Sequence, residues 1–109
     1  MMPTQPETVG DVFTDAATVI RERGWCQLNS RLPSGEVCMA TAINTSITAT
    51  VWPRSAAIYK SFYSAIEQHL GTQRLTRWND QPERTKTEVL KALESAAWTY
   101  SDQPLETPT

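Results

Sequence analysis

The sequence has few residues suited to metal or thiol chemistry, because its 109 residues include only two cysteines and one histidine. Cys26 and Cys38 are not spaced as a zinc-binding pair, and His69 alone does not complete a metal site. The sequence also has no phosphate-binding glycine loop, calcium loop or paired glutamate–histidine motif. We therefore expect no metal and no cofactor, and we expect both cysteines to be buried, unbridged thiols.

Neither a basic excess nor a long hydrophobic run is present. Ten basic residues face twelve acidic ones, for a net charge of -2, whereas domains that bind phosphate backbones usually carry a clear positive excess. The longest uncharged stretch, residues 37–53, contains too many threonines, serines and asparagines to cross a bilayer. The first twenty residues have no basic residue and no continuous hydrophobic run, so no secretory signal is indicated. We expect a cytoplasmic protein without membrane contact.

Apolar residues recur at three- and four-residue intervals in four segments, near residues 8–23, 37–46, 55–70 and 85–100. Gly24 and Gly71 are suited to end two of these segments, Ser55 can cap the third, and Thr85 with Glu88 matches a capping box. The pattern predicts a mainly α protein, a compact bundle of about four helices, with a short β-hairpin near residues 25–37. Residues 47–52 fit either helix or strand, and residues 72–84 read as a short turn followed by a polar loop.

One domain of about residues 8–100 follows from this pattern, with a flexible N-terminus over residues 1–7 and a flexible tail over residues 101–109.

Four linked features resemble a family of small actinobacterial and actinobacteriophage proteins whose function is not known. They are an amphipathic helix ending in Gly24-Trp25, a turn at Gly35, an aliphatic segment led by Cys38, and Trp78-Asn79-Asp80 before a threonine-capped helix. The resemblance covers about residues 9–97 and implies an intracellular bacterial or phage protein, in the host cytoplasm if phage-encoded. The family often has glycine where this chain has Leu28 and Thr41.

Asn79 and Asp80 are the best candidates for a role beyond core packing. Short polar side chains before a helix usually bond the local backbone and fix the loop. The functional alternative is a polar binding site at the loop, formed by Arg77, Trp78, Asn79, Asp80 and Arg84.

Two further interpretations use neighbouring residues. Basic residues interleaved with Trp78 in residues 74–86 would suit a nucleic-acid-binding surface, although Asp80 and Glu83 oppose it. Cys38, His69 and Asp80 supply the residue types of a cysteine enzyme or a small-molecule site, but no local signature joins them. We therefore assign no catalytic residue and do not expect an enzyme.

Four tryptophans and three tyrosines are many for a core of this size, so some aromatic side chains are expected at the surface, where they serve as binding anchors. Trp52 and Trp98, in addition to Trp78, are the candidate anchors. The sequence thus favours a small non-enzymatic interaction protein whose partner is either a second copy of the chain, as a homodimer, or a host protein.

Overall fold

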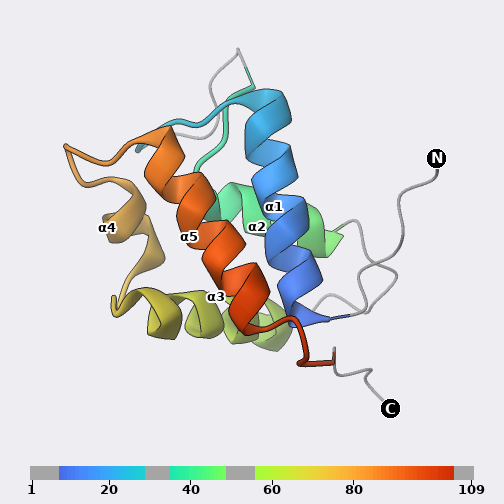
Figure 1. The fold of residues 1–109 in the computed structure, drawn as a ribbon. Helices are drawn as coiled ribbons and strands as arrows, with labels where there is room; N and C mark the ends of the chain where they lie inside the picture. Colours follow the sequence, from blue (N-terminus) through green and yellow to red (C-terminus); the bar gives the residue numbers. More distant parts are fainter. Residues whose placement is uncertain (1–7, 29–34, 49–55, 105–109) are drawn as a thin grey trace.

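The computed structural model describes residues 8–28, 35–48 and 56–104, which form a mainly helical bundle (Figure 1). Its elements, in chain order, are α1 (Val9–Arg23), α2 (Met39–Thr48), α3 (Ala56–Leu70), α4 (Leu75–Asn79) and α5 (Lys86–Thr99). The expected fold class is confirmed, and the described residues contain one more helix than the four apolar segments predicted. None of the helices in these ranges is long and apolar enough to cross a membrane.

Helix α1 begins at a reciprocal cap and ends at a glycine. The Thr8 hydroxyl accepts a hydrogen bond from the Asp11 amide, and the Asp11 carboxylate accepts one from the Thr8 amide, both at 3.1 Å. Two backbone donors that a helix start leaves unpaired are thereby satisfied. Gly24 has a φ of 91°, which side chains disfavour, so the helix stops where the sequence predicts. Its apolar stripe is buried, with Val12, Phe13 and Ile20 at the centre.

Helix α5 runs antiparallel to α1 and packs closely against it (Figure 1). The end of α5 meets the start of α1, where the amides of Val9 and Gly10 donate to the carbonyls of Gln103 and Tyr100. A Cβ atom at Gly10 would lie 2.3 Å from the Ala97 carbonyl oxygen, so only glycine permits this approach. Residues 101–103, placed by the sequence in a flexible tail, contribute to this junction, whereas residues 1–7 and 105–109 lie outside the described residues.

The predicted helix near residues 37–46 is α2, which continues to Thr48. It packs on the other side of α1, so α1 contacts both α2 and α5. Helix α3 packs against α2, α4 and α5, and its Phe62 ring contacts Phe13 of α1. It ends before Gly71, whose φ of 72° favours glycine. Residues 49–55, with Trp52 and the proposed cap Ser55, lie outside the described residues.

The segment near residues 25–37 does not show the expected hairpin among its described residues. Trp25 and Val37 instead form an isolated parallel bridge, in which the Cys26 amide donates to the Val37 carbonyl and the Val37 amide to the Gly24 carbonyl. A hairpin would pair its strands antiparallel, so the prediction of that pairing is wrong for these residues. The side chain of Asn79, which bonds Trp25 and Cys26 at this bridge, comes from α4, far along the sequence.

The polar loop predicted for residues 72–84 contains the short helix α4. Thr85 then caps α5 as expected: its hydroxyl accepts from the Glu88 amide, and its own amide donates to the Glu88 carboxylate at 3.0 Å. Helix α4 and the loop that follows it carry Arg77, Trp78, Asn79, Asp80 and Arg84, the residues proposed for a binding site.

Candidate functional site

Asn79 is 1% exposed and joins three parts of the chain. Its Oδ1 accepts hydrogen bonds from the indole of Trp25 at 2.7 Å and from the backbone amide of Met39 at 3.0 Å. Its Nδ2 donates to the carbonyl of Cys26 at 3.2 Å and to the carboxylate of Asp80 at 2.9 Å. The Met39 amide is the first of α2, so this side chain caps a helix that is distant in sequence. The buried side chain of Asn79 therefore links α4 to the start of α2 and to the segment that follows α1.

Asp80 and Gln27 extend the same network towards the surface. The Asp80 carboxylate accepts from the Leu28 amide at 2.9 Å, and the Gln27 amide group donates to the carbonyls of Asn79 and Gln81. These bonds hold Leu28 at a φ of 66°, a left-handed conformation unusual for this residue type, with its side chain 85% exposed.

Arg84 and Trp78 pair with each other. The Arg84 guanidinium carbon lies 3.6 Å from the centre of the Trp78 ring, and its Nε donates to the Trp78 carbonyl at 2.9 Å. Its other nitrogens donate to Glu88 and Gln81. Arg84 therefore covers one face of the half-buried indole, and each of its three nitrogens donates a hydrogen bond, while Arg77 lies exposed on α4.

The three residue types proposed for a cysteine enzyme have separate partners. The Cys38 thiol contacts the Thr41 hydroxyl at 3.4 Å, and the His69 ring bonds the Ser95 hydroxyl at 2.9 Å. Asp80 belongs to the Asn79 network. No hydrogen bond in the described ranges joins two of these three residues, and no group of three potential metal-ligating residues occurs there.

The cysteines themselves differ in burial. Cys26 is buried as expected, whereas Cys38, just before α2, is half-buried. Burial raises the pKa of the Cys26 thiol, and negative charge at Cys38, Glu36 and Asp80 adds to the effect.

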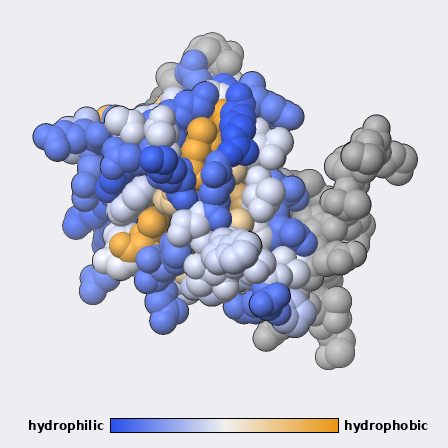
Figure 2. All heavy atoms as spheres, viewed as in Figure 1, coloured by the Kyte–Doolittle hydropathy of each residue, from blue (hydrophilic) through white to orange (hydrophobic). Residues whose placement is uncertain are grey.

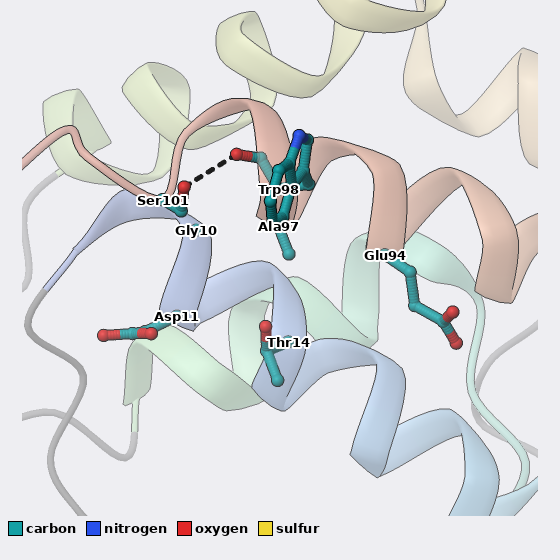
Figure 3. Close-up of a pocket in the computed structure, with 7 residues that line it drawn as sticks. All are labelled: Gly10, Asp11, Thr14, Glu94, Ala97, Trp98 and Ser101. Carbon is teal, nitrogen blue, oxygen red and sulfur yellow. Dashed lines mark hydrogen bonds between the residues drawn. The ribbon is translucent and has the colours of Figure 1, made fainter.

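Of the candidate anchors that the structure describes, Trp98 is the more exposed. It is 82% exposed near the end of α5, at the rim of a hollow of about 310 Å³ between α1 and α5. Figure 3 shows Glu94 and Trp98 on α5 beside Asp11 and Thr14 on α1. Gly10, Ala97 and Ser101 complete the lining, and the Ser101 hydroxyl donates to the Trp98 carbonyl at 2.8 Å.

We call the exposed surface of these two helices the α1–α5 face, formed by Thr14, Thr18, Arg21, Lys91, Glu94 and Trp98. This face is mostly hydrophilic, with small hydrophobic areas between polar side chains (Figure 2). Arg21 and Glu94 form an ion pair across the two helices.

Charge changes along the face. Asp11 and Asp102 lie at the end that holds Trp98, and Lys91 lies two turns earlier on α5. Towards the end where α1 finishes, Arg21 is paired with Glu94, and Glu22 lies between Arg21 and Arg23. Acidic side chains therefore flank Trp98, whereas acidic and basic side chains are mixed around Lys91, an arrangement that depends on the antiparallel packing of α1 and α5.

The fold and these contacts define a small helical protein. A polar network around Asn79 fixes the loop after α4, and an exposed tryptophan, Trp98, lies near the end of α5. A family model matches residues 4–99, and the chain belongs to this family, DUF6197, a family of unknown function. No curated protein and no solved structure matched the chain.

Proposed function

We propose that this protein acts by binding rather than by catalysis, and that a second copy of the chain binds to its α1–α5 face. The observation that carries the proposal is the 82% exposure of Trp98, the largest side chain type, beside a hollow. Tryptophan is enriched among residues that dominate the energy of protein interfaces, because its large ring loses much water-exposed surface on contact.

The charge pattern favours a second copy as the occupant. If two copies meet about a twofold axis with their α5 helices antiparallel, Lys91 of each copy lies against the acidic end of the other face. Lys91 and Trp98 are seven residues apart, so they follow one line of α5, separated by about 10 Å. An axis that crosses this line midway places Trp98 of each copy near Lys91 of the other copy.

That arrangement gives each lysine two favourable contacts. Its ammonium group can approach the Trp98 indole of the other copy and the nearby carboxylates of Asp11 and Asp102. The lysine stem would also cover part of the hollow beside Trp98. Because the contact occurs twice in a symmetric dimer, each substitution changes the association energy twice.

The proposal is tested by sedimentation velocity over a concentration series. We expect the unaltered protein to dimerise, and Trp98→Ala to lose about 2 kcal/mol per copy, or about 4 kcal/mol per dimer, which weakens association roughly 1,000-fold. Lys60→Glu on α3, away from the face, is the matched control for charge and should leave association unchanged.

Reversing the charges of Lys91 and Asp102 tests the proposed arrangement of the two copies more specifically. Lys91→Glu and Asp102→Lys should each weaken the dimer, whereas the double variant should regain much of the lost affinity, because opposite charges again face each other. A protein that stays monomeric to about millimolar concentration, where even contacts of about 4 kcal/mol would be visible, contradicts the proposal and leaves a different protein as the occupant.

The nucleic-acid interpretation receives less support. Its only aromatic side chain, Trp78, has one ring face covered by Arg84, and each nitrogen of Arg84 donates to a group of this chain. A base would have to displace this stacked guanidinium before it could stack on the ring.

A further inference from the structure

The parallel bridge between Trp25 and Val37 sets the register of two segments that each carry a cysteine. In such a pairing the next residues, Cys26 and Cys38, occupy paired positions. Paired positions of a parallel ladder direct their side chains to the same face. Paired backbones lie about 4.8 Å apart, within the range of about 4.4–6.8 Å between Cα atoms that a disulfide spans. The bridge therefore places two cysteines that are twelve residues apart in the sequence at paired backbone positions.

We propose that Cys26 and Cys38 form a reversible oxidation site, a dithiol that low-molecular-weight disulfides such as oxidised glutathione convert to an intramolecular disulfide. Both residues are thiols in the structure. The proposal concerns a site separate from the α1–α5 face and does not rest on the association proposed above.

The two thiols differ in access, which gives the reaction an order. Cys38 is half-buried, and its sulfur lies at the start of α2 beside the Thr41 hydroxyl, whereas Cys26 is 8% exposed. The Cys38 thiolate attacks one sulfur of the oxidant, and the first low-molecular-weight thiolate leaves. Rotation of the Cys38 side chain away from Thr41 then turns the mixed disulfide towards Cys26.

Cys26 completes the exchange. Its thiolate attacks the Cys38 sulfur, the Cys26–Cys38 bond forms, and the second low-molecular-weight thiolate leaves. The two protons released by the cysteines are taken up by the two leaving thiolates. The protein loses two electrons and the oxidant gains them, so no further reactant is needed.

The disulfide would act on the same junction as Asn79. This side chain already ties the Cys26 carbonyl to the first amide of α2, and the new bond would tie these segments covalently. Closing a loop limits the conformations of the unfolded chain, so oxidation should raise the urea midpoint of unfolding.

The experiment treats the folded full chain with oxidised glutathione and follows free thiols and intact mass. We expect both thiols to disappear and the mass to fall by two hydrogens, with no retained glutathione, and we expect dithiothreitol to reverse the change. The same treatment in denaturant is the control, and ring closure should be at least about tenfold faster in the folded chain, because the fold raises the effective concentration of one thiol near the other.

Single-cysteine variants resolve the order of the steps. Cys26→Ser should accumulate one stable glutathione adduct on Cys38, while Cys38→Ser should react more slowly because its remaining thiol is buried; circular dichroism verifies that both remain helical. Two glutathione adducts on the unaltered protein, a disulfide between two chains, or closure that is no faster than in denaturant would each overturn the proposal.

Discussion

The Asn79 network makes a quantitative prediction about stability. Asn79→Ala removes four hydrogen bonds and leaves the Trp25 indole, the Met39 amide and the Cys26 carbonyl without this partner. At about 0.5–1.5 kcal/mol for each bond, the expected loss is about 4 kcal/mol. Domains of this size have total stabilities of about 5–15 kcal/mol, so the variant should lose a large fraction of its stability.

Urea unfolding followed by circular dichroism measures this loss. Asn44→Ala is the matched control, since Asn44 is half-buried in α2 and accepts a hydrogen bond from the Tyr63 hydroxyl. That control should cost about 1 kcal/mol. If Asn79→Ala costs no more than Asn44→Ala, with equal slopes against urea, the network does not hold the junction and the reasoning is refuted.

Asn79→Asp separates the donors of the side chain from its acceptors. The carboxylate retains the acceptor for Trp25 and Met39 but places oxygen against the Cys26 carbonyl and the Asp80 carboxylate. Burial and the Asp80 charge should raise the pKa of the new carboxyl in the folded state. Its destabilisation should therefore shrink as pH falls through that raised pKa, because the protonated form can donate; a deficit independent of pH would contradict this assignment.

Three further predictions concern helix ends and close packing. Gly10→Ala, which would stabilise an ordinary helix, should cost about 1–3 kcal/mol here because its Cβ would meet the Ala97 carbonyl oxygen, and a raised melting temperature would contradict the close approach. Thr85→Ala should lower the free energy of unfolding in urea by about 1 kcal/mol, because the cap of α5 is lost. The pKa of its capping partner Glu88 is lowered, chiefly by the hydrogen bond to the Thr85 backbone. The stability that this carboxylate contributes should therefore be lost as pH falls through the lowered pKa. The pKa of Asp15 is raised by burial and by the carboxylate one turn earlier, so Asp15→Asn should stabilise the protein by about 0.2–0.5 kcal/mol at pH 7, with the gain disappearing as pH falls through that pKa.

The helices were predictable because their signals are local. Regular apolar spacing and the capping pair Thr85 and Glu88 determine where α5 begins, and Gly24 and Gly71 adopt positive φ angles at the ends of α1 and α3. Each signal lies within a few residues of the feature that it specifies, so no knowledge of the tertiary structure was needed.

The Asn79 network was only partly predictable. The sequence indicated that Asn79 and Asp80 would fix a loop, but their partners Trp25, Cys26 and Met39 lie 40 or more positions away. Short polar side chains usually bond nearby backbone, so spacing gave no reason to pair these segments. The same limit explains the missing hairpin, because the bridge at Trp25 depends on this distant asparagine.

The unusual backbone conformation of Leu28 was indicated by the family resemblance. The family resembled often has glycine at this position, and the structure gives Leu28 a φ of 66°, a region that glycine enters without steric cost. The hydrogen bond from its amide to Asp80 holds this conformation.

The exposure of Trp98, in contrast, follows from the packing of α1 against α5, which a pattern of apolar spacing in α5 alone does not specify.

The pairing of α1 with α5 bears on how the chain is made. A ribosome produces α1 first and α5 last, yet the start of α1 donates backbone hydrogen bonds to residues 100 and 103. Before α5 is made, the stripe of α1 can be covered by α2 and by Phe62 of α3, and the side that α5 covers stays open to water and to neighbouring chains. Closure of the domain must therefore wait until α5 has emerged, which makes nascent chains that stall before residue 86 the form most prone to aggregate.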